Sequence, residues 1–282
     1  MASFVLLHPA QQNLEAKYCM EQEKEMSFWD HLEELRWHIV RSAAAVVILG
    51  VVAFVNRGFI FDTLILGPSN SSFITNRLLC RIGEWLSLEG MCLDNMKLQI
   101  ININMSGQFL MHLYVSMVAG AILAFPFVLN EIWRFVRPAL HRNEKNYSRK
   151  AIVISSMLFF MGVVFSYYVI VPLTINFLGT YQVSDAVNNQ ISLNSYISTV
   201  VSVTFGVGVV FELPLIIYFL TKLGIVTPAY LKRNRKYMLV ILLTVSAIIT
   251  PPDVFSQILV CIPLMGLYEL SILVADKVVK KK

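Results

Sequence analysis

The residues that could carry chemistry begin with a short basic loop, Trp133 to Lys150, which lies between two long apolar runs. It holds one acid, Glu144, among six basic residues: Arg134, Arg137, Arg142, Lys145, Arg149 and Lys150. A carboxylate can pair bidentately with a guanidinium, with a geometric specificity that a lysine cannot match. Glu144 therefore either balances charge in a solvated loop or receives a cationic motif. Glu34 is a second acid expected on the same side of the membrane.

Glu212 is a second candidate, because it lies inside an apolar run, Tyr196 to Leu220. An ionisable group within a membrane segment is costly and is by default functional. Pro214 removes one backbone N–H, so we expect the helix to kink beside Glu212. Three interpretations stay open: a protonated, hydrogen-bonded core carboxylate, a proton relay, and a polar contact for an incoming helix.

A third polar group separates the last two apolar runs, at Thr250 to Asp253. The two prolines predict a tight turn, with Asp253 as the N-cap of the final helix. Gln257 lies one turn further on, and a lone amide in an apolar helix seeks a partner helix.

Several classes of site are excluded. The chain has no GxxxxGK[ST] phosphate loop and therefore no ATP motor, and it has no GxSxG or HExxH motif. Its four cysteines and five histidines show no ligand spacing, so we predict no metal site and no cofactor. No nucleophile has a base at a plausible spacing, so the chain is not expected to be an enzyme.

The elements that position these residues are predicted to be membrane helices. Of 282 residues, 56% are apolar and only 15% are charged, whereas a soluble domain is about a quarter charged. The apolar residues fall in long blocks, which indicates an all-α membrane protein. The net charge of +5 is spread over short loops and the tail, so anionic lipid headgroups fit it better than nucleic acid does.

We expect six transmembrane helices, at about residues 37–55, 108–132, 151–178, 196–220, 237–249 and 254–275. Pro126 is expected to interrupt the second of them. The last two are expected to be short, because Tyr237–Ile249 reaches only roughly 20 Å against a hydrocarbon core of ~30 Å. Local bilayer thinning or packing against partner helices would accommodate them.

The membrane domain is placed at residues 27–276, between a disordered extension, 1–26, and a basic tail, 277–282. Ser27 to Asp30 forms a capping signal, and apolar residues recur at helical spacing after it. We therefore expect a short amphipathic helix that lies in the headgroup plane and leads into the first span.

The distribution of basic residues predicts the topology. The loops at 134–150 and 222–236 hold six and five basic residues, whereas 180–195 holds none. Both basic loops and both termini are therefore expected in the cytoplasm. Cys80 and Cys92 share the long outer segment, Asn56 to Gly107, where a disulfide and two free thiols are both open. The same segment, in which isoleucine and asparagine alternate at Ile101–Asn104, is expected to hold short helices and an extended piece.

The chain resembles a known family, TatC, the multi-spanning subunit of the twin-arginine protein translocase. The resemblance rests on four blocks whose order and spacing agree from Phe28 to about Ala275: HLEELR at 31–36, FVRPAL at 135–140 with Glu144 four residues on, the glycine-rich stretch 205–214 that ends in FELP, and TPPDVFSQ at 250–257.

The resemblance implies a receptor for signal peptides that carry paired arginines, on precursor proteins exported in the folded state. By motif, the signal-binding residues are Glu34, Arg36, Phe135 and Glu144, and the turn-forming residues are Pro68, Pro138, Pro214 and Asp253. Glu212 matches the family's intramembrane glutamate, and with Gln257 it is expected to contact partner helices.

The implied partners are TatA- and TatB-type single-span subunits, within a hetero-complex that holds several copies of the chain in a bacterial cytoplasmic membrane. The proton-motive force is implied as the energy source. The outer loop with Cys80 and Cys92 departs from the family's commoner, shorter loop, so residue-level matching there ends at Pro68. The alternative function is a proton- or ion-coupled secondary transporter centred on Glu212.

Overall fold

The structure is a computed structural model of the chain, and it describes residues 28–70, 73–85, 99–136, 147–184 and 189–280. Within these ranges, five helical stretches are long and apolar enough to cross a membrane: Leu32–Val55, Gly107–Phe135, Ala151–Thr180, Leu193–Lys222 and Val254–Lys280. The prediction of an all-α membrane protein is confirmed. The extension at 1–26 lies outside the described residues.

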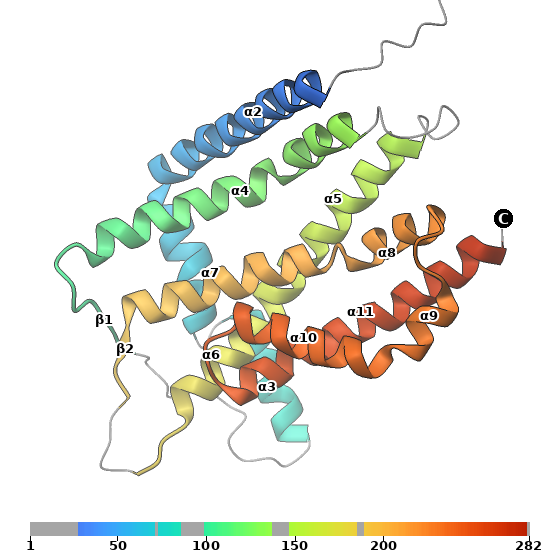
Figure 1. Ribbon diagram of the computed structural model, residues 1–282. Coiled ribbons are helices and arrows are strands. Elements are labelled where there is room, and N and C mark those ends of the chain that lie inside the picture. Colours follow the sequence, from blue (N-terminus) through green and yellow to red (C-terminus); the bar gives the residue numbers. More distant parts are fainter. Residues whose placement is uncertain (1–27, 71–72, 86–98, 137–146, 185–188, 281–282) are drawn as a thin grey trace, which may run out of the picture.

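The first two long helices lie side by side (Figure 1). Helix α2 is one continuous helix, Phe28–Val55, so the prediction of a separate amphipathic helix in the headgroup plane is wrong. Within α2 no glycine or proline precedes Gly50, and the charged first turns therefore continue directly into the apolar part. Helix α4, Gly107–Val136, likewise runs through Pro126 without the predicted interruption. Neighbouring helices allow such a proline in a membrane helix.

The third and fourth apolar runs each change helical geometry partway. Helix α5, Tyr147–Phe165, passes through a π-helical segment, η5, Ser166–Ile170, into α6, Val171–Thr180. Helix α7, Leu193–Val210, is separated from α8, Leu213–Lys222, by a turn at Phe211–Glu212. The predicted kink is confirmed, and Pro214 lies in the first turn of α8, where its missing N–H costs nothing.

The C-terminal part begins with the short α9, Pro228–Arg233, and α10, Arg235–Ile249. Helix α11, Val254–Lys280, has 27 residues, so the prediction of a short final span is wrong. Pro263 lies inside α11 without ending it, and Glu269 pairs with Arg235 of α10 at 2.8 Å. Because the helix reaches Lys280, it also includes most of the predicted basic tail.

The outer segment forms short elements at the end of the bundle away from the start of α2 (Figure 1): η1, Phe59–Ile65; η2, Gly67–Ser69; and α3, Ile74–Trp85. Strand β1, Ile100–Ile101, pairs in parallel with β2, Ile191–Ser192, and confirms the expected extended piece. Cys80 is disulfide-bonded. Cys92 lies outside the described residues, so its pairing with Cys80 stays a prediction.

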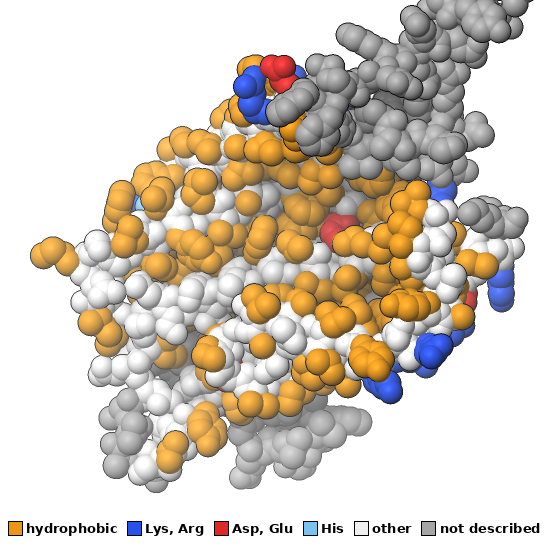
Figure 2. Space-filling view, in the orientation of Figure 1, with side chains coloured by type: hydrophobic (Ala, Val, Ile, Leu, Met, Phe, Trp, Pro, Cys, Tyr) orange, Lys and Arg blue, Asp and Glu red, His pale blue; other side chains and the backbone are white. Residues whose placement is uncertain are grey.

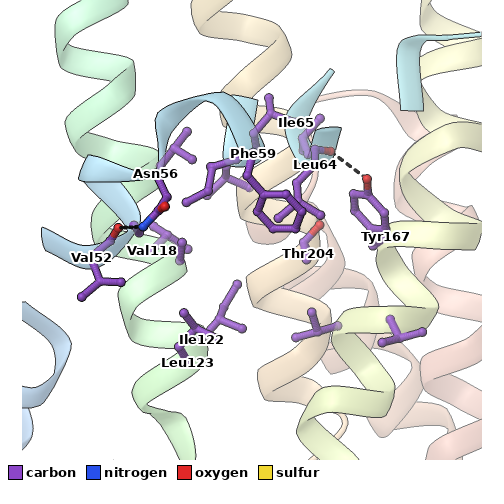
Figure 3. A pocket seen from close by; sticks show the side chains of 18 of the residues that line it. Val52, Asn56, Phe59, Leu64, Ile65, Val118, Ile122, Leu123, Tyr167 and Thr204 are labelled. Atoms are coloured by element: carbon purple, nitrogen blue, oxygen red, sulfur yellow. Dashed lines mark hydrogen bonds between the residues drawn. The ribbon is translucent and has the colours of Figure 1, made fainter. Parts of the chain in front are cut away.

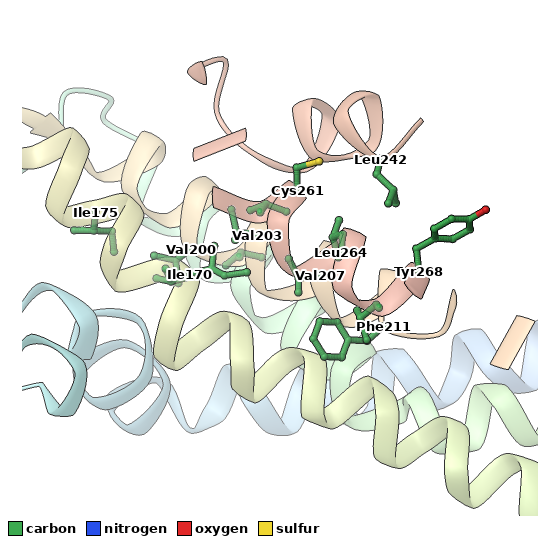
Figure 4. Packing of buried hydrophobic residues seen from close by; sticks show 14 of the residues in the cluster. Ile170, Ile175, Val200, Val203, Val207, Phe211, Leu242, Cys261, Leu264 and Tyr268 are labelled. Carbon is green, nitrogen blue, oxygen red and sulfur yellow. The ribbon is translucent and has the colours of Figure 1, made fainter. Parts of the chain in front are cut away.

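Many of the buried apolar core residues belong to α7 and α11, and others come from α2, α4, α8 and α10 (Figure 4). Val203 and Val207 of α7 and Leu264 of α11 are fully buried, and Tyr268 is 1% exposed. On the outside, hydrophobic side chains cover much of the visible face, and lysine and arginine side chains lie along its upper and right-hand margins (Figure 2). This distribution suits a protein whose long flanks face lipid.

Candidate functional site

The structure brings two of the predicted site residues close to one histidine, across α2 and α4. His38 is buried in α2; its Nε2 lies 4.0 Å from Oε1 of Glu34, one turn earlier. The ring of Phe135, from α4, meets the His38 ring edge-on, with 6.1 Å between ring centroids. Arg36 is directed elsewhere and pairs with Glu33 at 3.2 Å. Glu144 and Pro138 lie outside the described residues.

A residue that sequence reasoning missed, Glu131 of α4, is the most deeply buried acid of this region, with 2% exposure. Its Oε2 accepts a hydrogen bond from Nδ1 of His38 at 2.6 Å. Nη1 of Arg134 lies 3.2 Å from Oε1, and Nη1 of Arg41 lies 3.7 Å from Oε2. Glu131 is a carboxylate inside a predicted span, and the argument that selected Glu212 applied to it equally.

Beside this cluster is a hollow of about 320 Å³, which we call the α2–α4 hollow. It is lined by Glu34, Trp37, His38, Arg41 and Arg134. Oε2 of Glu34, one of the residues that line it, is buried and has no hydrogen-bond partner among the described residues. A buried acceptor without a partner is costly, so the α2–α4 hollow favours a ligand that donates hydrogen bonds.

Glu212 lies in the turn between α7 and α8 and is 7% exposed. Its Oε2 accepts a hydrogen bond of 2.5 Å from the hydroxyl of Ser155 in α5, and its Oε1 is buried without a partner. Among the described residues, only one of the two carboxyl oxygens of Glu212 therefore has a hydrogen-bond partner.

The turn residues have local roles. The amide of Ser256 donates to Oδ1 of Asp253 at 2.6 Å, which confirms Asp253 as the N-cap of α11. The side chain of Gln257 donates to the carbonyl of Leu243 in α10 at 3.0 Å, so its partner helix lies within the chain. Pro68 is buried in η2.

A second cavity, of about 520 Å³, lies near the other end of α2 (Figure 3). Its lining is almost entirely apolar, with residues such as Phe59, Ile122 and Leu123. The hydroxyl of Thr204 is buried in it without a partner, and the hydroxyl of Tyr167 donates to the carbonyl of Leu64 at 2.8 Å. This lining does not suit a charged motif, so the candidate site stays at the α2–α4 hollow.

Metal binding finds no support in the described part of the chain, where no three His, Cys, Asp or Glu residues are grouped to hold an ion.

Comparison with known proteins identifies the family. Residues 30–263 match the model of the Sec-independent protein translocase protein (TatC). The protein of that name from Blattabacterium sp. subsp. Periplaneta americana is 39% identical over 266 residues, which cover 93% of this chain and 100% of the relative. The one from Desulforapulum autotrophicum is 36% identical over 93% of this chain and 89% of the relative.

A crystal structure titled twin arginine translocase receptor TatC matches with a TM-score of 0.71 and 30% identity, and it covers 88% of this chain and 99% of the solved chain. The family match, over residues 30–263, includes both helices of the α2–α4 hollow. The chain is therefore a multi-pass membrane protein and a translocase receptor rather than an enzyme, and it belongs to the bacterial TatC family of the twin-arginine pathway.

Proposed function

We propose that the chain recognises paired-arginine signal peptides on folded precursor proteins, through Glu34 in the α2–α4 hollow and Glu144 in the loop that follows α4. The observation that carries this proposal is the buried, unpartnered Oε2 of Glu34 in a hollow that also exposes the Trp37 ring. A guanidinium supplies the missing donors and can stack on an aromatic face. Phe135 and Arg36 complete the proposed binding surface.

The membrane arrangement that supports this function has six spans, in which α10 is the fifth in chain order and is added to the five long apolar helices. Helix α10 has 15 residues and reaches roughly 22 Å. It packs against the longer α11, and its basic end is anchored by the Arg235–Glu269 pair. Both termini and both basic loops lie in the cytoplasm, because basic residues gather at those ends.

The partners of the chain are single-span TatA- and TatB-type subunits, further copies of the chain and membrane lipids. Glu212 supports a partner contact, since Oε1 is buried without a hydrogen-bond partner near the surface of a lipid-embedded bundle. The absence of a nucleotide-binding motif fits transport driven by the proton-motive force.

The test is site-specific crosslinking of a signal peptide to the full chain in membranes. Glu34→Gln and Glu144→Ala are each expected to reduce crosslinking of an Arg-Arg peptide at least about tenfold, because each removes a charge-assisted pair. Asp62→Asn is the control, since Asp62 is an exposed acid in η1, near the other end of α2. Undiminished crosslinking in both site variants, with normal membrane insertion, contradicts the proposal.

A further inference from the structure

The imidazole of His38 lies between two carboxylates, one buried and one at the α2–α4 hollow. Nδ1 is 2.6 Å from Oε2 of Glu131, and Nε2 is 4.0 Å from Oε1 of Glu34. We propose that Glu131 is a positioning residue that orients His38, so that Nε2 acts as a hydrogen-bond acceptor for an incoming guanidinium beside Glu34. This inference rests on the proposed function and adds two residues to it.

The hydrogen bond to Glu131 determines which ring nitrogen carries the proton. A carboxylate only accepts, so Nδ1 is the donor at 2.6 Å. The distance from Nε2 to Glu34 is too long for a hydrogen bond. Nε2 therefore remains available at the edge of the hollow, as in sites where the bond at one ring nitrogen sets the role of the other.

Charge counting supports a neutral ring. The two acids of the cluster, Glu131 and Glu34, are matched by two guanidinium groups, those of Arg134 and Arg41. The cluster is therefore balanced without a charge on His38. The Phe135 ring packs against the imidazole edge and restricts its rotation.

The resulting pair of acceptors fits a planar donor. A guanidinium presents several N–H groups in one rigid plane, so one N–H can donate to Oε2 of Glu34 and another to Nε2 of His38. A lysine ammonium is a compact point charge without this fork. Glu131 thus contributes to the preference for arginine without touching the ligand.

Two amide variants of His38 test whether Nε2 acts as an acceptor for the ligand. The alternative is that the His38–Glu131 hydrogen bond only holds α2 and α4 together. The amide N–H of His38→Asn can replace the Nδ1 donor to Glu131, but the variant has no acceptor at the Nε2 position. The longer His38→Gln can place its amide oxygen near the Nε2 position. The probes are synthetic Arg-Arg and Lys-Lys signal peptides, whose affinities for the purified full chain are measured by fluorescence anisotropy alongside its thermal unfolding.

We expect His38→Asn to keep its unfolding midpoint but to lose about tenfold in affinity for the Arg-Arg peptide, with unchanged affinity for the Lys-Lys peptide. His38→Gln should retain most of the Arg-Arg affinity, and Glu131→Leu should lose it as His38→Asn does. Wild-type affinity in His38→Asn overturns the inference, and so does an equal loss for both peptides. If the unchanged chain does not distinguish the two peptides, the proposed function itself fails.

A measurement without substitution covers the case of a variant that does not fold. In histidine-labelled wild-type protein, ¹⁵N NMR should show His38 with a proton on Nδ1 and none on Nε2, and the Nε2 resonance should shift when the Arg-Arg peptide is added. The resonance is assigned by its absence in His38→Gln. If that variant does not fold, it is assigned by a nuclear Overhauser effect between the His38 ring and a labelled Phe135 ring. A proton on Nε2 of the free protein overturns the inference.

Discussion

At the scale of residues, the two buried acids, Glu131 and Glu212, differ in how they are satisfied. Glu131 has a hydrogen-bonded histidine and two nearby guanidinium groups, whereas Glu212 has the Ser155 hydroxyl on one oxygen and no partner on the other. Burying a polar group without a partner costs free energy, and the cost is larger for charged groups. Both oxygens of Glu131 therefore have partners, and Glu212 is the acid that a further contact would stabilise.

The Ser155 hydroxyl should thus be important for stability. Ser155→Ala leaves both oxygens of Glu212 without a described donor and should lower the free energy of unfolding by about 1–3 kcal/mol. Ser156→Ala is the matched control, because that hydroxyl donates to the carbonyl of Ile152 within its own helix. Thermal unfolding in one detergent compares them, and equal midpoints would show that the Glu212 bond is not stabilising.

At the scale of elements, the α2–α4 pair sets the geometry of the site, because Glu34 and His38 come from one helix and Glu131 and Phe135 from the other. The two helices approach closely at Gly50 and Gly120. A Cβ atom at Gly120 would lie 2.5 Å from the backbone nitrogen of Gly50 and 2.6 Å from the carbonyl oxygen of Val46. Backbone atoms cannot move aside as a flexible side chain can, so this crossing requires glycine.

Gly120→Ala should therefore separate α2 from α4. We expect a loss of about 1–3 kcal/mol in the free energy of unfolding, as for other overpacked interiors, together with weaker binding of an Arg-Arg peptide. Gly266→Ala in α11 is the control, since a Cβ atom there meets nothing within 4 Å. Thermal unfolding and peptide anisotropy measure both effects, and a Gly120→Ala protein that matches Gly266→Ala in both would contradict the prediction.

At the scale of the whole molecule, the two ends of the bundle have different chemistry. The charged cluster of the α2–α4 hollow lies in the first turns of α2, whereas the apolar cavity and the short outer elements lie near its C-terminal end. Ion pairs at the second basic region, Lys232–Asp276 and Arg235–Glu269, tie α9 and α10 to α11. In the topology proposed above, with both basic regions on the cytoplasmic face, a precursor that arrives from the cytoplasm would meet the charged end first.

The orientation can be measured by single cysteine additions. Met105 is fully exposed before α4, and Leu223 is 58% exposed after α8. In intact spheroplasts, a membrane-impermeant maleimide mass tag should add to Met105→Cys, and it should add to Leu223→Cys only after lysis. Tags are counted relative to the unchanged chain, which accounts for the native cysteines. The reverse pattern would place the charged end outside.

The sequence by itself determined the features that depend on one turn of helix or on composition. Hydropathy established the membrane class, Pro214 located the kink at Glu212, and Asp253 was identified as a helix cap. These signals are local, because helical spacing, caps and prolines act within about four residues.

Only the tertiary structure decided which polar groups meet. The Glu131–His38 hydrogen bond joins residues 93 positions apart, and its formation depends on how α2 and α4 pack along their whole length. The continuity of α11 was missed for a related reason, since Glu269 finds its partner on another helix. Residue types show that a charge needs a partner, but the packing of the helices selects that partner.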